Sequence, residues 1–395
     1  MNKRILLYLV ALSAFMGPFT QTIYTPLLPE VQADLHTTQF LINLTISVFT
    51  VMLALMQIVY GPLTDMKGRR VVLLPGMALY VLATLGCAFS PSISWLLVFR
   101  GLQAAGIATG SVVATTVIGD LFAGIERGRA MGTFQMMVSL GAVAGPLIGG
   151  YIGAHAGFHG VFWVLAGVGS ALLLSIGLLL PETKSVESAG DRFSVKRFAV
   201  VLRDPTGMSV ILLGFIQYYT FYNFLVFLPD ILSRVYRLGI EAKSLVFLPL
   251  SLAIAIGSPI GGRLQERVEP RKSLILTSSL NVAAVVLFLL LSKVSLVLLV
   301  ISIFLFGLCL GLSLPVQTTL LTGAFLRERA TAIGVYNFFR YMGMAAGPMV
   351  GTLLYGSGNI PLLYGVAAVL FALTVWLASQ RLRAGAGGVS PSGAK

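Results

Sequence analysis

The sequence predicts an all-α membrane protein with twelve membrane-spanning helices, arranged as two six-helix halves. Three observations predict it: the composition, the spacing of long apolar runs, and glycine and proline motifs that recur about 200 residues apart. The chain has 395 residues, of which 57% are hydrophobic and 10% are charged, and its mean hydropathy is +0.92. Because soluble domains are about a quarter charged, this composition excludes an ordinary soluble fold.

Twelve apolar runs are each long enough to cross a bilayer as a helix, which takes about 20 residues. They lie at 5–30, 37–62, 71–90, 94–119, 129–153, 160–180, 207–231, 243–262, 274–291, 296–321, 332–356 and 361–380. A transmembrane β-barrel would instead need segments of about ten residues with alternating polarity. Continuous apolar runs such as 287–291 do not alternate, so the runs predict helices.

The positions of Lys and Arg predict the orientation, because basic loops stay on the cytoplasmic side of a membrane. With the N-terminus inside, the cytoplasmic segments hold 21 of the 27 basic residues and the external loops hold four. The expected location is therefore the cell membrane, with both termini cytoplasmic. The net charge of +13 is spread over short loops and forms no basic face with interleaved aromatic residues, so it does not predict nucleic-acid binding.

The glycine pattern Gly-x-x-x-Gly-Pro-x-x-Gly occurs twice, 202 residues apart. The two copies consist of Gly141, Gly145, Pro146 and Gly149, and of Gly343, Gly347, Pro348 and Gly351. LPEV at 28–31 matches LPDI at 228–231, and Gly61-x-Leu63-x-Asp65 matches Gly262-x-Leu264-x-Glu266. Three matches at nearly one offset predict a duplicated six-helix unit. An even number of spans gives both copies the same orientation, a known transporter plan with the substrate between the halves.

The predicted boundaries follow from this duplication. The N-terminal half takes 1–180, a cytoplasmic linker 181–206, the C-terminal half 207–380, and a disordered cytoplasmic tail 381–395. Within the linker, a short interfacial helix would place Phe193, Phe198, Val201 and Leu202 against lipid. In each glycine motif the small residues share one helix face and let another helix approach. Two interpretations of this face remain open: plain helix packing, or a tight contact beside the second or eighth span that stops proton leak.

Four motifs carry a resemblance to a known family. They are GPLTDMKGRR at 61–70, FRGLQAAG at 99–106, GAVAGPLIGG at 141–150 and LPET at 180–183. The first is similar to the signature loop of the major facilitator superfamily, and the others resemble its fourth-, fifth- and sixth-helix motifs. The resemblance covers essentially the whole chain and implies the fold of this superfamily, in its twelve-helix drug:proton antiporter branch. The second copy departs from the loop pattern at 269–271.

The resemblance implies a conformational latch on the cytoplasmic side. Asp65 would cap the N-terminus of the eleventh span, while Arg69 or Arg70 pairs with Asp120 and holds the outward-facing state. The gating residues expected in this way are Gly61, Asp65, Gly68, Arg69, Arg70 and Asp120, together with the glycine and proline residues of the fifth-helix motif. The alternative is a loop that serves only as a topological anchor.

Two charged residues are expected well inside spans, where ionisable side chains are expensive and usually functional. They are Arg100 in the fourth span and Arg340 in the eleventh. The family motif implies that Arg100 takes part in proton coupling, with snorkelling to the surface as the alternative. Arg340 is expected to face the central cavity, or else to bond carbonyl groups of a neighbouring helix.

No Asp or Glu is expected at mid-membrane, so the candidate proton carriers lie near helix ends. Glu30 and Asp34 follow the first span, and Asp230 lies at the matching point of the seventh. The alternative for all three is a solvated helix end. Polar and aromatic residues at central depth predict a substrate pocket, with helix packing as their alternative role. They are Gln21, Tyr24, Gln103, Gln217, Tyr218, Tyr222, Asn223, Gln317, Asn337 and Arg340.

These observations favour a secondary active transporter over an enzyme. There is no Gly-Lys-Ser/Thr loop for phosphate and no evident nucleophile and base pair. Two Cys residues without a Cys/His cluster predict neither a disulfide framework nor a metal site. The expected function is proton-coupled efflux of small amphipathic compounds by a monomer without a cofactor. Transport of organic anions or sugars is the alternative within this class, and a non-transporting sensor or scaffold is the competing class.

Overall fold

The structure, a computed structural model, describes residues 3–183, 196–238, 240–355 and 358–386. The chain divides into two compact units. The first contains Met1–Phe193 and Arg327–Gly334, and the second contains Ser194–Leu326 and Val335–Lys395. Throughout the described ranges the regular elements are helices, so the prediction of an all-α fold is confirmed.

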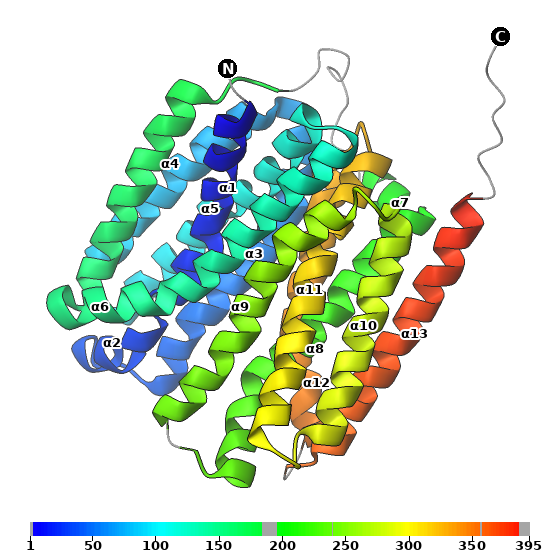
Figure 1. Cartoon of the computed structure of the whole chain (residues 1–395). Helices are drawn as coiled ribbons and strands as arrows, with labels where there is room; N and C mark the ends of the chain where they lie inside the picture. The colour runs from blue at the N-terminus through cyan, green and yellow to red at the C-terminus, as the bar shows by residue number, and fades with distance from the viewer. Residues whose placement is uncertain (1–2, 184–195, 239, 356–357, 387–395) are drawn as a thin grey trace. The chain divides into compact units, whose positions relative to one another are not determined.

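The helices follow the predicted order along the chain (Figure 1). Those of the first part are α1 (Lys3–Thr22), η1 (Thr25–Leu27), α2 (Leu28–Asp34), α3 (Gln39–Lys67), α4 (Arg69–Ala88), α5 (Ile93–Leu121) and α6 (Gly124–Leu179). They are followed by α7 (Lys196–Arg203), α8 (Pro205–Tyr236), α9 (Ile240–Leu264), α10 (Pro270–Leu291), α11 (Leu296–Ala324), α12 (Arg329–Tyr355) and α13 (Ile360–Ala386).

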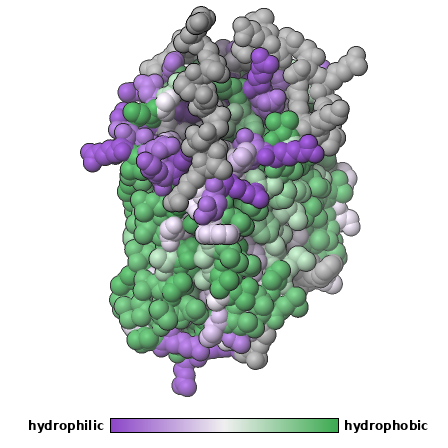
Figure 2. Space-filling view, turned by 90° about the vertical axis from the view of Figure 1, so that its right-hand side faces the viewer, coloured by the Kyte–Doolittle hydropathy of each residue, from purple (hydrophilic) through white to green (hydrophobic). Residues whose placement is uncertain are grey.

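Ten helices among the described residues are long and apolar enough to cross a membrane. One of them, α6, contains two predicted spans, 129–153 and 160–180, which meet at Gly157 with a non-helical φ of 62°. The predicted span 332–356 lies in α12, which is not among the ten. On the face drawn in Figure 2, hydrophobic residues form a wide band and hydrophilic residues gather at its ends. Both observations describe a chain that crosses a membrane several times.

The first predicted span, 5–30, is shorter in the structure. Helix α1 ends at Thr22, and η1 and α2 then each begin with a proline near the start, at Pro26 and Pro29. Proline lacks the N–H group that a continuing helix needs, so it is favoured at the first positions of a new helix. The first span therefore ends about two turns early, and the residues after it belong to separate short helices.

The predicted linker and tail boundaries also differ from the helix ends. The linker contains α7, in which Val201 is fully buried and Val200 is exposed, so the predicted lipid contact of Val201 is wrong. Phe193 lies outside the described residues. Helix α13 continues to Ala386, past the predicted end of the half at residue 380. Residues 387–395 of the predicted tail also lie outside the described part of the chain.

The same helix pairs recur in the two units. In the first unit, α1 packs on α5 and α6, α3 packs on α5, and α4 packs on α5 and α6. In the second unit, α8 packs on α11 and α13, α9 packs on α11, and α10 packs on α11 and α13. Helix α12 approaches α8 through its glycine motif, as the first half of α6 approaches α1. This correspondence is the structural counterpart of the sequence repeat.

Candidate functional site

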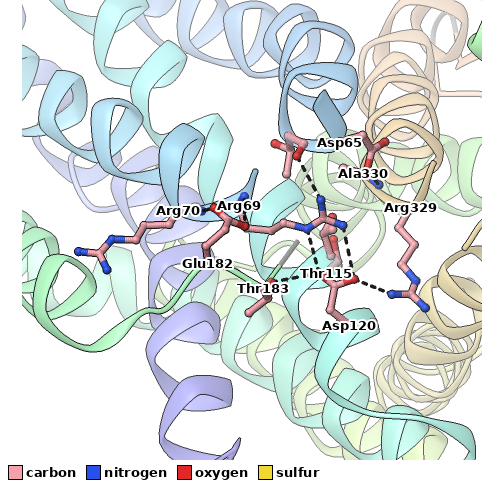
Figure 3. Close-up of polar contacts among 12 residues, drawn as sticks. Asp65, Arg69, Arg70, Thr115, Asp120, Glu182, Thr183, Arg329 and Ala330 are labelled. Atoms are coloured by element: carbon pink, nitrogen blue, oxygen red, sulfur yellow. Dashed lines mark hydrogen bonds and ion pairs between the residues drawn. The ribbon is translucent and has the colours of Figure 1, made fainter. Parts of the chain in front are cut away.

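Asp65 caps the first turn of α12. Its side chain, on the last turns of α3, is 4% exposed and accepts hydrogen bonds from the backbone N–H groups of Ala330 (3.1 Å) and Thr331 (2.8 Å). The Thr331 hydroxyl group donates a third bond, of 2.8 Å. A helix N-terminus has unpaired N–H groups and a partial positive charge, so a carboxylate stabilises both. All these residues belong to the first unit, and Figure 3 shows Asp65 beside Ala330.

Two glycines let α3 and the start of α12 approach this closely. A Cβ atom added to Gly61 would lie 2.9 Å from the Ala330 oxygen, and one added to Gly334 would lie 2.4 Å from the Gln57 oxygen. Both distances are shorter than a carbon atom tolerates, so a larger side chain at either position would separate the two backbones. Gly61 and Gly334 therefore bring α3 close enough to α12 for Asp65 to cap the first turn of α12.

Arg69 forms a buried ion pair with Asp120 on α5. The Arg69 Nε atom lies 2.8 Å from Asp120 Oδ2, and the two side chains are 6% and 11% exposed. Arg329, at the start of α12, reaches the other oxygen at 2.5 Å, and the Thr183 hydroxyl group donates to Oδ2 at 3.0 Å. One carboxylate thus accepts from three donors (Figure 3). Arg70 does not join them, because its Nη2 atom donates to the carbonyl oxygen of Gly177.

Glu182 and Arg329 belong to this network but were not among the predicted site residues. The Glu182 carboxylate accepts the first two N–H groups of α4, from Arg69 (2.9 Å) and Arg70 (3.1 Å). Gly68, with φ of 105°, makes the turn between α3 and α4, and an added Cβ atom would lie 2.5 Å from Glu182 Oε2. A sequence signal existed for Arg329, because it lies 202 residues after Arg127, the offset of the repeat.

Arg100 is completely buried in the first unit. Its Nη1 atom donates to Gln103 Oε1 at 2.7 Å and to the Thr20 carbonyl oxygen at 3.4 Å. The guanidinium carbon lies 4.8 Å from the ring centre of Tyr24 and 4.2 Å from that of Phe49. The Nε and Nη2 atoms have no hydrogen-bond partner, and among the described residues no carboxylate forms an ion pair with this side chain. Full burial argues against snorkelling to the surface.

None of the candidate proton carriers is among the hydrogen-bond partners found for Arg100. Glu30 is half-buried and Asp34 is exposed, both on α2. Asp230, near the end of α8, pairs with Arg234 at 2.8 Å and accepts a hydrogen bond from the Tyr355 hydroxyl group at 2.7 Å. These carboxylates therefore belong to helix ends, and a part in proton coupling stays a prediction.

A chain of hydrogen bonds crosses the second unit. The Tyr336 hydroxyl group donates to Gln317 Oε1 (2.7 Å), and Gln317 Nε2 donates to Gln217 Oε1 (2.6 Å). Gln217 Nε2 then donates to the Ser313 hydroxyl oxygen (2.8 Å), which donates to the carbonyl oxygen of Leu310. The two glutamines are fully buried and bonded to each other. Their helix-packing role, joining α8, α11 and α12, is thus visible in the structure.

Arg340 lies beside this chain, on α12. Its guanidinium carbon is 4.8 Å from the ring centre of Tyr218, 5.6 Å from that of Tyr336 and 5.7 Å from that of Tyr341. The side chain is 8% exposed, and its Nε atom has no hydrogen-bond partner. Within the described part of the second unit, no carboxylate forms an ion pair with it. Arg340 is therefore a second buried cation that contacts neutral aromatic groups.

The other predicted substrate residues divide between the units. In the first unit, Gln21 donates to Thr50 at 2.9 Å, Tyr24 shares a hydrogen bond with Thr45, and Gln103 donates to Thr84 at 2.8 Å. In the second unit, Asn223 and Asn337 are buried and Tyr222 is half-buried, with its ring against Phe221. The first-unit residues are therefore hydrogen-bonded within their own unit, whereas the buried amide of Asn223 has no hydrogen-bond partner among the described residues.

The glycine face of α6 lies against α1. A Cβ atom on Gly149 would lie 1.6 Å from the carbonyl oxygen of Ile23, and one on Gly141 would lie 2.6 Å from that of Phe15. Gly145 meets Thr22 on the same helix, and Pro146 is half-buried beside it. This contact fits the plain packing interpretation, and a contact beside the second or eighth span stays a prediction. Small residues show that a helix comes close, but they do not identify which helix it is.

Among the described residues, no group of three His, Cys, Asp or Glu side chains could hold a metal ion. Cys87 and Cys309 are buried free thiols in different units. The polar groups of the site are therefore amides, hydroxyl groups, guanidinium groups and helix-end carboxylates, which can bind organic ligands and protons.

Comparisons with known proteins agree with this architecture. The family model described as Major Facilitator Superfamily matches residues 10–210 and 210–393. The uncharacterized MFS-type transporter YdgK of Bacillus subtilis is 30% identical over 323 residues, covering 80% of each chain. Citrate exporter 1 of Aspergillus niger is 36% identical, and multidrug transporter QDR2 of Candida glabrata is 34% identical. These two matches cover 44% and 45% of this chain, but only 33% and 31% of the fungal proteins.

Solved structures show the same fold. The human organic anion transporter MFSD10 (TETRAN) superposes with a TM-score of 0.82 at 19% identity, covering 96% of this chain and 100% of that one. The proton:xylose symporter XylE has a TM-score of 0.80 at 13% identity, with 95% and 94% covered. Identities this low show the fold alone. Together with the family model over almost the whole sequence, these likenesses show that the chain belongs to the Major Facilitator Superfamily of multi-pass membrane transporters, which are not enzymes.

Proposed function

We propose that this chain exports small amphipathic compounds in exchange for protons, by alternating access. The observation that carries the proposal is Arg100, a fully buried cation that touches Tyr24 and Phe49 and, among the described residues, bonds neutral oxygen atoms. Ionisable side chains inside a membrane protein are expensive and mark proton or ion pathways. A fixed positive charge at this position favours deprotonation of any carboxyl group that comes near it, and in this way couples proton release to a conformational change.

The contacts of Asp65 and Asp120 would act as the latch of this cycle. They hold the start of α12, residues Arg329–Gly334, within the first unit, while α12 continues from Val335 into the second unit. Releasing the Asp65 cap would free a helix that carries Arg340 eleven residues after Arg329, or about 16 Å along the axis at a rise of 1.5 Å per residue. A change at the latch would thus act on α12, the same helix that carries Arg340.

The names of three relatives each support one part of this proposal: export, a range of drugs, or exchange. They are the citrate exporter of Aspergillus niger, the multidrug transporter QDR2 of Candida glabrata and the MFS antiporter QDR3 of Candida albicans. The half-buried tyrosines Tyr218 and Tyr222 support amphipathic ligands, because aromatic faces contact apolar surface while hydroxyl groups remain available for hydrogen bonds. Cytoplasmic termini, a cell-membrane location and a monomeric state stay part of this proposal.

Proton-coupled transport is tested with purified protein in liposomes. A pH gradient is imposed, internal pH is followed with an entrapped dye, and cationic, neutral and anionic lipophilic compounds are added in turn. We expect compound-dependent proton movement in the wild type and none in Arg100→Gln. Lys67→Gln, which removes an exposed cation from the cytoplasmic loop, should behave as the wild type. Compound flux without any change of internal pH would overturn the coupling.

The alternative, transport of organic anions or sugars, has one observation in its favour. Arg340 is a buried cation with no ion-pair partner among the described residues of the second unit, and such a group suits an anion better than a sugar. The likeness to a sugar symporter is one of fold only. The anionic form of the alternative therefore has structural support in this chain.

A further inference from the structure

We infer that Arg340 and the three tyrosines around it form a subsite for the single negative charge of an amphipathic organic anion. The inference rests on the proposed function, since it names the class of compound that the transporter carries. It needs only residues of the second unit: Tyr218 on α8, and Tyr336, Arg340 and Tyr341 on α12.

The close contact of α8 and α12 holds the Arg340 group in place. A Cβ atom on Gly343 would lie 2.3 Å from the Phe215 carbonyl oxygen, and one on Gly347 would lie 2.6 Å from that of Tyr219. Backbones that approach this closely leave little freedom to the residues one turn earlier. Arg340 precedes Gly343 by three positions, and Tyr218 precedes Tyr219 by one, so both lie at this crossing.

The charge of Arg340 has no counter-charge in the middle of the unit. The acidic residues of the second unit are Asp204, Asp230, Glu241, Glu266 and Glu269. Asp204 is the N-cap of α8, Asp230 is paired with Arg234 near the end of that helix, and the remaining three lie in the first turn of α9 or between α9 and α10. Arg340 instead lies near the middle of the 27-residue helix α12. A buried cation without a counter-charge is unfavourable until an anion pairs with it.

The neighbouring neutral oxygens are largely occupied. Gln317 Oε1 accepts from Tyr336 and Gln217 Oε1 accepts from Gln317, so these amides are bonded to each other. Tyrosine hydroxyl oxygens near the guanidinium can accept a hydrogen bond, but they carry no charge to balance it. The Nε atom of Arg340 remains buried without a partner. A carboxylate or sulfonate would supply the missing acceptor in charge-assisted form.

The tyrosine rings predict the rest of the ligand. Tyr218, Tyr222 and Tyr341 are half-buried, so part of each ring is accessible, and flat apolar groups stack on such surfaces. One guanidinium group matches one carboxylate, whereas a tricarboxylate would place two further charges among uncharged rings. The subsite therefore fits an aromatic or aliphatic monoanion better than citrate.

The test compares two ligands of the same shape. Naphthalene-2-carboxylate and naphthalene-2-carboxamide are titrated into the purified full-length protein in detergent, and binding is measured by calorimetry and by the shift of the unfolding midpoint. We expect the carboxylate to bind about tenfold or more tightly, the size expected for one charge-assisted hydrogen-bonded contact. Citrate should bind more weakly than the naphthalene carboxylate.

Variants locate the effect. In Arg340→Gln the affinities for the carboxylate and the carboxamide should become about equal. The affinity for the carboxamide should stay within about threefold of the wild-type value. Lys272→Gln removes a cation from the same unit at a side chain that is 79% exposed, and should keep the wild-type preference. If Arg340→Gln does not fold, Tyr218→Leu replaces the ring nearest the guanidinium and should weaken binding of both naphthalene compounds several-fold.

The outcomes separate this inference from the proposed function, because the binding experiment needs neither a membrane nor a pH gradient. Equal affinity of the wild type for the two ligands, an unchanged preference in Arg340→Gln, or unchanged affinities in Tyr218→Leu would overturn the subsite. A preference that Arg340→Gln abolishes supports the subsite, even if liposomes show no proton movement and the coupling fails. Proton movement in liposomes without any preference would support the coupling and reject the subsite.

Discussion

The two buried arginines, Arg100 in the first unit and Arg340 in the second, differ in what holds them. Arg100 is bonded to Gln103, which is bonded in turn to Thr84. Its other neighbours are Thr20 on α1, Tyr24 in the turn after α1, and Phe49 on α3. Gln103 lies on α5 and Thr84 on α4, so the surroundings of Arg100 come from four helices and one turn. Among the described residues, the aromatic rings that contact Arg340 come from α8 and α12. Arg100 is thus built into the core of its unit, whereas Arg340 lies at a single helix crossing.

The different surroundings of Arg100 and Arg340 suit them to different roles. A side chain tied to several helices senses their relative movement, because any shift of one helix changes its bonds to the others. A side chain at one crossing, with half-buried tyrosines around it, can accept a ligand while the rest of its unit remains unchanged. We therefore expect Arg100 to determine whether transport is coupled and Arg340 to determine which compound is carried.

The largest expected effect is the loss of coupling in Arg100→Leu. Without the cation, the proton pathway loses its fixed charge, and compound-driven proton flux should fall by about a hundredfold, the lower range for a group that assists proton transfer. The measurement is internal pH in liposomes with a neutral lipophilic compound. Arg340→Leu is the matched control and should retain flux of that neutral compound. Equal losses in both variants would break the comparison.

The next effect concerns the latch at the start of the helix that carries Arg340. Asp65→Ala removes the acceptor of the Ala330 and Thr331 N–H groups and should destabilise the capped arrangement by about 1–2 kcal/mol. That energy is about a tenfold shift of a two-state equilibrium. The shift is measured by labelling a single introduced Cys at residue 333 on α12, in a background without Cys87 and Cys309. Lys67→Ala is the control, and equal labelling rates in all variants would reject the latch.

Stability should distinguish the two arginines more finely. Arg100→Leu leaves Gln103 Oε1 buried without its donor, which should lower the free energy of unfolding by about 1–3 kcal/mol. Arg340→Leu removes a charge without an ion-pair partner in the described part of its unit, so stability without ligand should be unchanged or higher. Denaturation of the detergent-solubilised proteins measures both. A larger loss in Arg340→Leu than in Arg100→Leu would contradict the assignment of roles.

Sequence alone predicted the parts of the molecule that depend on composition or on local geometry. Runs of apolar residues predicted the helices, because only a helix satisfies its own backbone within lipid. Contacts made to backbone groups were harder to foresee, except where the family resemblance implied one, as it did for Asp65. Glu182 binds the N–H groups of Arg69 and Arg70, which any residue could offer, so no side-chain pairing pointed to it. The neighbour of Gly149 was also missed, because a small residue is compatible with any partner helix.

The smallest expected effect lies at the end of α8, where Asp230 pairs with Arg234. The Arg234 side chain is 56% exposed and that of Asp230 is 36% exposed, so water screens the pair and its contribution to stability should be about 0–1 kcal/mol. Asp230→Asn should therefore leave the free energy of unfolding almost unchanged. It should also keep the preference of the Arg340 subsite for naphthalene-2-carboxylate, because this carboxylate pairs with Arg234 instead of Arg340. A stronger preference for the carboxylate in Asp230→Asn than in the wild type would mean that Asp230 balances the charge of Arg340 in the wild type, and would contradict a subsite without a counter-charge in its own unit.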